Sequence, residues 1–215
     1  MKPHYTVQHP DLRIEVLTGE AIQPHLSDLA RLRIEVFREY PYLYDGSFAY
    51  EADYLSTFAA DNRSIFVLAV RQPTESNQEP TVIGVATGLP LDGQHEEFTQ
   101  PFIRAGIDPA TVFYFSESVL LPEFRGHGVG TAFLRAREDH ASSLQHIRLC
   151  AFCSVERPEN HPMKPTNHKP LDGFWERCGF VKRPELQTQF SWKEVAEDDE
   201  SPKTMTFWIK PTGEI

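Results

Sequence analysis

A glycine-rich turn at residues 125–130 is the part of the sequence best suited to bind a charged ligand. It reads Arg-Gly-His-Gly-Val-Gly, follows an apolar stretch and leads directly into a helical pattern. Glycine lets backbone N–H groups approach a ligand closely, and a helix N-terminus adds unpaired donors and the positive end of a dipole. The turn therefore predicts a pyrophosphate cradle, with Arg125 as a nearby positive charge. The alternative is a tight strand-to-helix turn that needs glycine for steric reasons alone.

The spacing of the glycines separates this turn from two other phosphate-binding loops. A P-loop ends in Gly-Lys-Ser/Thr, whereas Gly130 is followed by Thr131 with no lysine. A dinucleotide-binding fingerprint reads Gly-x-Gly-x-x-Gly, and the third glycine of this turn is out of step with it. The pattern that fits is Arg-x-x-Gly-x-Gly, formed by Arg125, Gly128 and Gly130.

Length and composition are those of a soluble globular protein. The chain has 215 residues, of which 40% are hydrophobic and 24% charged, and its formal net charge is −10. We expect a single domain over residues 1–215, located in the cytoplasm, because no membrane-spanning stretch or secretory signal is evident. The negative charge argues against nucleic-acid binding and suits a cationic acceptor better than an anionic one.

The cysteines and the acidic run near the C-terminus indicate no chemistry of their own. We expect buried, reduced thiols, because an odd number of cysteines with few converging ligands does not form a zinc site. The three are Cys150, Cys153 and Cys178. The acidic residues 197–200 are expected to form a solvated loop.

Hydrophobic periodicity predicts strands that alternate with helices. Strands are expected at residues 12–17, 64–70, 81–89, 111–121, 146–155, 189–195 and 205–210, and helices at 22–39, 50–58, 96–104, 129–143 and 171–178. Residues 111–121 are almost continuously apolar, which is typical of a buried central strand. Pro41 should end the first helix, and Gly179 should cap the last.

This order of elements, together with two motifs, resembles the GNAT superfamily of N-acetyltransferases over almost the whole chain. The Arg-x-x-Gly-x-Gly turn resembles the loop that binds the acyl-CoA pyrophosphate in that family. Residues 174–180, Phe-Trp-Glu-Arg-Cys-Gly-Phe, resemble the family's Phe-Tyr-Glu-Lys-x-Gly-Phe ending, where a short helix packs by the cofactor thiol. The resemblance implies an α/β (α+β) fold with a mixed, mostly antiparallel central sheet flanked by helices. It also implies a V-shaped splay between the two central strands.

The resemblance further implies acetyl-CoA as co-substrate, without a metal. The pantetheine arm should meet backbone groups of the central strand, and the pyrophosphate should meet the glycine turn. The cofactor-binding residues expected on this basis are Val119, Leu120, Leu121, Arg125, Gly126, His127, Gly128, Val129, Gly130, Thr131 and Trp175.

Glu117 is the main candidate for a general base. A carboxylate within a buried strand is desolvated, which raises its pKa and makes it a better base, either directly or through water. Two other roles stay open: a structural acceptor for an arginine or backbone amide, or a group that binds the acceptor amine without taking its proton. Tyr114 is a weaker candidate for which core packing is expected.

The sequence departs from the family at Trp175, which stands where a tyrosine is often credited with protonating the thiolate. Indole has no useful acidity near neutral pH, so Trp175 cannot supply that proton. We expect it to pack against the pantetheine or the acetyl pocket. The general acid is therefore left open, and the thiolate can leave to water.

Two loops are candidates for the acceptor side. In the family the first two helices line this side, and residues 40–46 join them here. Within this loop Tyr42, Tyr44 and Asp45 could hold an organic cation by aromatic faces and charge, or could form a well-packed turn. The proline-rich loop 157–170 is expected to be stiff and to lie beside the acceptor mouth. Its His161 and His168 lack an evident third metal ligand.

Taken together, these features predict an N-acetyltransferase that moves an acetyl group from acetyl-CoA to a primary amine of a small molecule or peptide. Transfer would be direct, within a ternary complex, and a homodimer is one assembly that the prediction allows. The alternative is a non-catalytic GNAT domain that binds acyl-CoA as a sensor or assembly module. An α/β-hydrolase is disfavoured, because the sequence has no Gly-x-Ser-x-Gly elbow.

Overall fold

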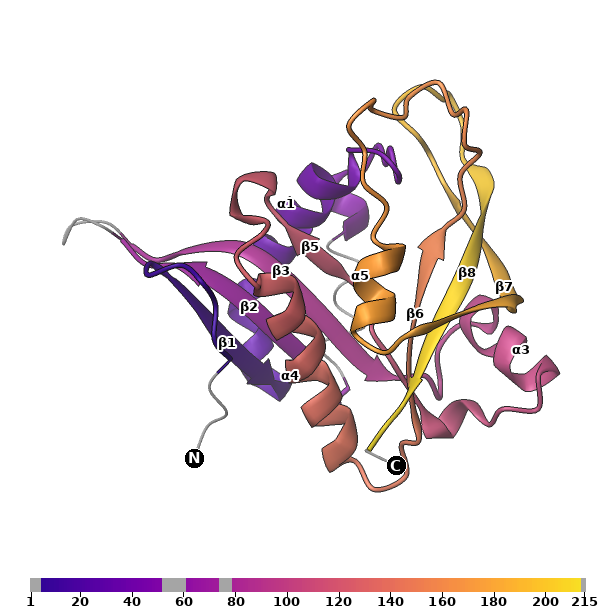
Figure 1. Ribbon diagram of the computed structural model, residues 1–215, viewed down its shortest axis with the longest axis horizontal. Helices are drawn as coiled ribbons and strands as arrows, with labels where there is room; N and C mark the ends of the chain where they lie inside the picture. Colours follow the sequence, from indigo (N-terminus) through magenta and orange to yellow (C-terminus); the bar gives the residue numbers. More distant parts are fainter. Residues whose placement is uncertain (1–4, 52–60, 74–78, 214–215) are drawn as a thin grey trace.

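The computed structural model describes residues 5–51, 61–73 and 79–213 (Figure 1). Its strands are β1 (Leu12–Thr18), β2 (Ile65–Arg71), β3 (Thr81–Pro90), β4 (Val112–Tyr114), β5 (Ser118–Leu120), β6 (Leu149–Val155), β7 (Val181–Trp192) and β8 (Ser201–Pro211). Its α-helices are α1 (Leu26–Phe37), α3 (Glu96–Arg104), α4 (Val129–Ser143) and α5 (Asp172–Arg177). Short 3-10 helices are η1 (Gly19–His25), η2 (Pro109–Thr111) and η3 (Pro122–Phe124). Most of the helix expected at residues 50–58 lies outside the described residues.

The strands form one sheet whose order is β1-β2-β3-β4-β6-β8-β7, with β5 paired to β3. The pair β4–β6 is parallel, and the other paired strands are antiparallel. The prediction of a mixed, mostly antiparallel sheet is therefore confirmed. Among the described strands β5 has β3 as its partner and does not pair with β6, so the sheet opens between β5 and β6 beyond the β4–β6 pair. This opening is the V-shaped splay.

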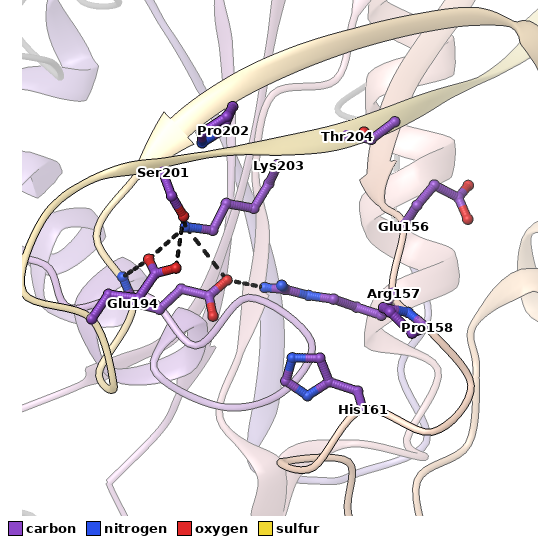
Figure 2. Close-up of a pocket in the computed structure, with 10 residues that line it drawn as sticks. Glu156, Arg157, Pro158, His161, Glu194, Ser201, Pro202, Lys203 and Thr204 are labelled. Carbon is purple, nitrogen blue, oxygen red and sulfur yellow. Dashed lines mark hydrogen bonds and ion pairs between the residues drawn. The ribbon is translucent and has the colours of Figure 1, made fainter.

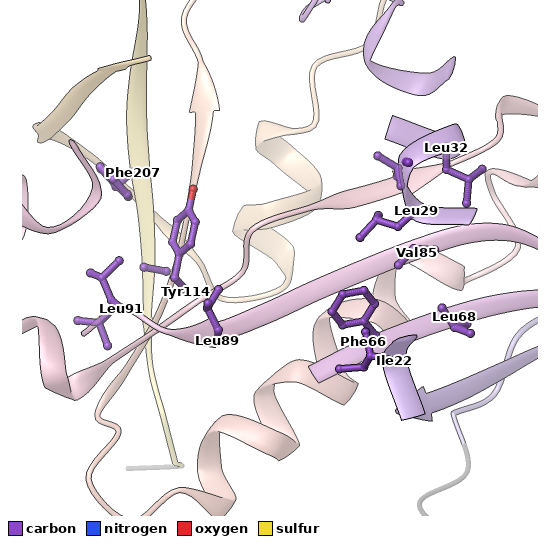
Figure 3. Close-up of a cluster of buried hydrophobic side chains, with 14 of the residues drawn as sticks. Ile22, Leu29, Leu32, Phe66, Leu68, Val85, Leu89, Leu91, Tyr114 and Phe207 are labelled. Atoms are coloured by element: carbon purple, nitrogen blue, oxygen red, sulfur yellow. The ribbon is translucent and has the colours of Figure 1, made fainter. Parts of the chain in front are cut away.

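The two faces of the sheet carry separate hydrophobic cores. Strand β2 shows why, because Phe66, Leu68 and Val70 belong to one core and Ile65 and Val67 to the other. Alternate side chains of a strand point to opposite faces, so a strand that is covered on both faces is apolar throughout. Figure 3 shows part of the first core, which lies under η1 and α1. Helices α4 and α5 cover the second core.

The central strand differs from its prediction, because residues 111–121 do not form one continuous strand. The ladder is interrupted at residues 115–117, where the Ser116 N–H donates to the Thr87 carbonyl at 3.2 Å and the Thr87 N–H donates to the Glu117 carbonyl at 3.0 Å. Two residues thus oppose one, which is a β-bulge. Continuous apolar character cannot reveal a bulge, because the extra residue changes the register and leaves the composition unchanged.

Several other boundaries needed correction. The first helix was predicted from residue 22, but residues 19–25 form the 3-10 helix η1 with Pro24 inside it, and α1 starts at Leu26. Proline has no N–H to donate in an α-helical ladder. Strand β6 starts at Leu149 and not at residue 146. The C-terminal hairpin is longer than predicted, with β7 from Val181 and β8 from Ser201. Most of its added residues are polar, and the pairing is interrupted between Arg183 and Gln187, so periodicity missed them.

The ends of the α-helices agree better with the sequence. Helices α3 and α4 have the predicted limits. Gly179 follows α5 with φ of +88°, which confirms its role as a left-handed cap. No helix among the described residues is long and apolar enough to cross a membrane.

The cysteines are unpaired, as predicted. Cys150 is buried in the core under α4, whereas Cys153 packs against the core under α1, as alternation along β6 requires. Cys153 and Cys178 are only half-buried, so the expectation of three buried thiols was wrong for these two residues.

Candidate active site

The glycine turn presents backbone donors rather than side chains. Gly126 and Gly128 have φ of +86° and +83°, a left-handed conformation that favours glycine. Gly128 is also the N-cap of α4, where no side chain accepts a hydrogen bond from the first turn. The N–H groups of that turn therefore have no acceptor within the helix. A pyrophosphate is the kind of ligand that such a cradle fits.

Gly130 has a packing role in the same turn. A Cβ atom at Gly130 would lie 3.3 Å from Cζ of Phe174, which is tighter than ordinary contact. The third glycine thus lets the start of α4 pack against α5. Conformation thus explains Gly126 and Gly128, and steric fit explains Gly130. The pyrophosphate cradle stays a prediction.

Arg125 and His127 have partners within the protein. The half-exposed Arg125 guanidinium donates to the Leu120 carbonyl, from Nε at 3.3 Å and from Nη2 at 3.2 Å, and Nη2 lies 3.4 Å from Glu39 Oε2. The His127 carbonyl accepts a 2.8 Å hydrogen bond from the N–H of Gln8. The N-terminal segment thus braces the turn, a contact that the sequence did not suggest.

The backbone of β5 alternates between the two sides of the splay. The Leu121 N–H donates to the Ile83 carbonyl of β3 at 3.1 Å, and the Glu117 carbonyl accepts from β3. Because successive residues of a strand direct their backbone groups to opposite edges, Val119 and Leu121 face β3 and Leu120 faces the open side. Of the three residues predicted to meet pantetheine through their backbone, Leu120 is thus the one whose groups are directed into the splay.

The bulge places the Glu117 carboxylate on the α1 side of the sheet. Its side chain is 3% exposed. Oε1 accepts a hydrogen bond from Arg33 Nη1 of α1, and Oε2 accepts one from the Thr87 hydroxyl of β3. The candidate base is therefore also an acceptor for a buried arginine, one of the roles that the sequence left open.

Arg33 links Glu117 to a second buried carboxylate. Its Nε donates to Oε2 of Glu51 at 2.6 Å, and the Tyr44 hydroxyl donates to Oε1 of Glu51 at 2.9 Å. The side chain of Arg33 is 12% exposed and that of Glu51 is fully buried. One guanidinium is thus shared by two desolvated carboxylates. Burial together with Glu51 raises the pKa of Tyr44.

Tyr42 packs beside this group, whereas Asp45 does not join it. The Tyr42 ring centroid lies 4.6 Å from that of Phe37 and 6.0 Å from that of Trp192, and burial raises the pKa of Tyr42. Asp45 instead pairs with Arg38 at 3.1 Å and with Lys193 at 3.3 Å. Hydrogen bonds from these two cations lower the pKa of Asp45. The structure therefore separates the three candidate acceptor residues into two inner tyrosines and an outer ion pair.

Tyr114 and Ser116 precede Glu117 in the chain and carry two further polar groups. The Tyr114 hydroxyl is 3.0 Å from the Cys153 thiol, and burial raises the pKa of that thiol to about 12. Tyr114 also packs within the core under α1, as predicted. The hydroxyl of Ser116 is shielded from solvent and has no hydrogen-bond partner. Since both residues of the bulge direct their side chains to one face, Ser116 adds an unsatisfied hydroxyl beside Glu117.

Trp175 packs within an aromatic group at the start of the second motif. Its ring centroid is 5.0 Å from that of Phe152 and 5.1 Å from that of Trp208. The residue is half-buried. These contacts give Trp175 a packing role between α5 and the sheet.

The proline-rich loop lies against residues 40–46. The ring of Tyr40 is 5.6 Å from that of His161 and 4.7 Å from that of His168. Arg157 donates to the carbonyls of Pro41 at 2.7 Å and Tyr42 at 3.1 Å. In the described part of the chain no three His, Cys, Asp or Glu side chains gather at a potential metal position.

A pocket of about 640 Å³ lies between this loop and the β7–β8 hairpin (Figure 2). Its charges are paired, since Arg157 contacts Glu194 at 2.6 Å and Lys203 contacts Glu197 at 2.7 Å. Hydrogen bonds from Lys203 and Ser201 hold the pKa of Glu197 at about 2. The expectation of a fully solvated acidic run was thus wrong for Glu197, which ties the segment between β7 and β8 to β8.

Sequence reasoning missed the arginines that organise the site. Arg33 and Arg137 are both nearly buried, with Arg33 four residues after Leu29 of the α1 core stripe and Arg137 four residues after Phe133 of the α4 stripe. Residues four apart share a helix face. A charged residue on an apolar stripe was the available signal.

The comparisons with known proteins agree with this geometry. The sequence profile of the acetyltransferase (GNAT) family matches residues 28–180. No curated protein sequence matches the chain. Among solved structures, NAA60 of Arabidopsis thaliana with acetyl-CoA has a TM-score of 0.61 at 13% identity, covering 92% of this chain and 98% of that one. Spermidine N-acetyltransferase of Vibrio cholerae with CoA and spermine has a TM-score of 0.51 at 12% identity, covering 95% and 97%.

At these identities the solved structures establish the fold alone. They share the mixed, mostly antiparallel sheet flanked by helices that the described strands form. The family profile, by contrast, spans more than half of the chain and includes both the glycine turn and the Phe-Trp-Glu-Arg-Cys-Gly-Phe segment. The chain therefore belongs to the acetyltransferase (GNAT) family.

Proposed function

We propose that this protein is an N-acetyltransferase that transfers the acetyl group of acetyl-CoA directly to a primary amine of a small molecule or peptide. The observation that carries the proposal is the position of Glu117. This buried carboxylate lies three residues before Leu120, whose backbone faces the splay, and the glycine turn follows on the same stretch of chain. A candidate base and a cradle for the cofactor are thus held by one continuous segment.

The cofactor half of the site, residues 119–131, binds and orients acetyl-CoA. The thioester supplies an activated acetyl group when acetyl-CoA is bound. The N–H groups at the start of α4 hold its pyrophosphate, and the backbone of Leu120 meets its pantetheine arm. Arg125 covers the Leu120 carbonyl, so we expect its guanidinium to move or to share that carbonyl when the arm enters.

The acceptor half receives the amine. We propose that Glu117 binds the incoming amine and takes its proton, directly or through one water. Arg33 and Thr87 fix the carboxylate, so the geometry is set before the amine arrives. Tyr42 and Tyr44 would line the acceptor side, and the unsatisfied hydroxyl of Ser116 offers it a further hydrogen bond.

A second candidate function is a non-catalytic domain that binds acyl-CoA. Two observations favour it. Trp175 has no proton to give the departing thiolate. Arg33 already pairs with Glu117, which leaves the carboxylate less free to act as a base.

Two measurements test the proposal in sequence. Saturating acetyl-CoA, at about 100 times Kd, should stabilise the native protein by roughly 2.7 kcal/mol and raise Tm by roughly 5–10 °C. ATP at the same concentration serves as a control for charge alone. Thiol release is then followed with a panel of polyamines, amino acids, aminoglycosides and peptide N-termini.

The outcomes separate the two functions. A Tm shift with thiol release for one class of amine supports the transferase. A shift with no release above the rate of hydrolysis supports the binding domain. No shift with acetyl-CoA or any longer acyl-CoA rejects both.

A further inference from the structure

Arg137 is the most deeply buried cation among the described residues, with an exposed fraction of 1%. It lies on α4, and its guanidinium donates four hydrogen bonds. Nε donates to the Phe133 carbonyl at 3.0 Å, within its own helix. Nη1 donates to the carbonyls of Thr87 and Glu117, each at 3.1 Å, and Nη2 donates to the Ser118 hydroxyl at 2.8 Å.

Three of these acceptors belong to the bulge and its partner strand. Thr87 and Glu117 are the residues whose backbones pair across the irregularity, and Ser118 begins β5. The guanidinium also lies 4.3 Å from the ring centroid of Phe115, the residue directly before Ser116 and Glu117. A bulge weakens the regular ladder and leaves carbonyl lone pairs to satisfy. Arg137 satisfies two of these carbonyls from the α4 side of the sheet, whereas the Glu117 carboxylate lies on the α1 side.

Core packing alone would not select an arginine here. Burial lowers the pKa of Arg137 to about 9, which reflects the cost of removing a guanidinium from water. An apolar side chain of similar length would fill the space without that cost. The planar fork of arginine, however, can hold two carbonyls and a hydroxyl at once. What the residue adds is fixed geometry at the bulge.

Arg137 also joins the two halves of the site. Helix α4 begins at Val129, directly after the glycine turn, and Arg137 follows about two turns later on the same helix. The Glu117 carboxylate lies on the other face of the sheet, held by Arg33 and Thr87. The helix that carries the cradle is thereby connected by one side chain to the backbone that carries the carboxylate.

We propose that Arg137 is a positioning residue, whose guanidinium fixes the bulge at residues 115–118 and so aligns Glu117 with a cofactor held at the N-terminus of α4. The inference rests on the proposed function for its catalytic consequence. The hydrogen bonds by which Arg137 fixes the bulge, called the clamp below, can be tested without turnover.

The first test compares Arg137→Lys with Arg135→Lys, a control on the same helix whose side chain is exposed. Lysine keeps the charge but cannot hold the three acceptors as a planar fork. We expect Arg137→Lys to lower kcat by about 10- to 100-fold, because misplacing a reacting group by about 1 Å costs about that much. KM for acetyl-CoA should change by less than about threefold, and Arg135→Lys should match the wild type. A parallel loss of kcat in both variants, or a loss confined to KM, would overturn the proposal.

The second test needs no turnover. Amide hydrogen exchange is measured by mass spectrometry on the peptides that cover residues 112–121, with and without acetyl-CoA. Arg137→Lys should speed exchange there while circular dichroism and exchange in β1 and β2 stay as in the wild type. If the wild type binds acetyl-CoA but acetylates no amine, the proposed function fails and this readout still decides the role of Arg137. Unchanged exchange at residues 112–121 in a folded Arg137→Lys protein rejects it.

A milder variant covers the case in which Arg137→Lys does not fold. Ser118 is exposed, so Ser118→Ala removes one acceptor of the fork without opening the core. We expect faster exchange at residues 112–121 in this variant, by a smaller factor, and a two- to fivefold loss of kcat for a single hydrogen bond. Wild-type exchange in Ser118→Ala would count against the clamp.

Discussion

The cofactor half and the acceptor half of the candidate site are built in different ways. The cofactor half is a short continuous segment, residues 119–131, that presents mostly backbone groups. The acceptor half is a set of side chains from four separated parts of the chain, centred on Arg33, Glu51, Thr87 and Glu117. Each of these side chains takes its position from another.

This difference affects how each half can change. Backbone recognition depends on conformation, so the turn needs its glycines but places little demand on the side chains between them. An interlocked group of buried charges tolerates little, because removal of one partner leaves another charge unpaired. The acceptor half is therefore where we expect the largest effects of single substitutions.

The sharpest test of the acceptor half is Glu117→Gln beside Glu51→Gln. Both carboxylates bind Arg33, and either variant leaves the guanidinium one acidic partner. We expect Glu117→Gln to lower kcat by about 10²- to 10³-fold, since general-base catalysis contributes of that order. Glu51→Gln should lose about tenfold or less. Steady-state thiol release with the preferred amine measures both.

Equal losses in the two variants would show that Glu117 acts only through Arg33. An unchanged Glu117→Gln enzyme would remove it from the chemistry altogether. Acetyl-CoA affinity, followed by the shift in Tm, should be close to wild type in both variants, because neither residue belongs to the glycine turn.

The cofactor half is tested by Gly128→Ala, with Gly93→Ala as control. Both glycines have positive φ, at +83° and +78°, and neither has a close contact for a new methyl group. Each substitution should cost roughly 1–2 kcal/mol of backbone strain. Only Gly128→Ala should also weaken acetyl-CoA binding, by about tenfold in isothermal titration. Equal affinity in both variants would mean that the turn is not the pyrophosphate site.

Substitutions at two tryptophans should have smaller effects, one in each half of the site. Trp192→Phe removes the Nε1–H that donates to the Tyr42 carbonyl at 3.0 Å, and Arg157 remains as a second donor. We expect KM for the amine to rise about fivefold, as for loss of about 1 kcal/mol.

Trp175→Phe should leave kcat within about threefold, because the ring packs and gives no proton. A kcat loss above about 100-fold in Trp175→Phe would show that Trp175 takes part in the reaction.

The smallest effect is expected at the hairpin that braces the acceptor loops. The pKa of Glu197 is lowered from 4.5 to about 2, so its contribution to stability is complete above pH 4.5 and is lost as the pH falls toward 2. At pH 7 Glu197→Gln should lower Tm by roughly 2–4 °C, the size expected for a partly exposed pair. The exposed Glu200→Gln should have no effect. A difference in Tm that stays constant below pH 4 would contradict the assignment.

The sequence predicted helices and their ends correctly where patterns within a few residues determine the structure. Helix α4 follows from the spacing of Val129, Phe133 and Ala136, and the cap of α5 follows from Gly179 alone. Predictions failed where pairing decides the outcome. Strand β7 lacks a regular apolar alternation, and its strand structure comes from pairing with β8.

The candidate site divides along the same line. The glycine turn and Glu117 could be predicted, because one is a local conformation and the other is a charge within an apolar run. The roles of Arg33, Thr87 and Arg137 could not be predicted, although the two arginines lie on apolar helix stripes. Their partners outside their own helices are 18 to 84 residues away in sequence. That separation has no periodic signature.

The sequence by itself determined the element order and the glycine turn that leads into α4, because both depend on residues within a few positions of one another. The tertiary structure decided which edge of β5 faces the splay and that a bulge turns Glu117 toward α1. It also decided that Arg33 and Arg137 approach this bulge from opposite faces of the sheet. These features depend on which strands and helices become neighbours, and that is set by the packing of both cores together.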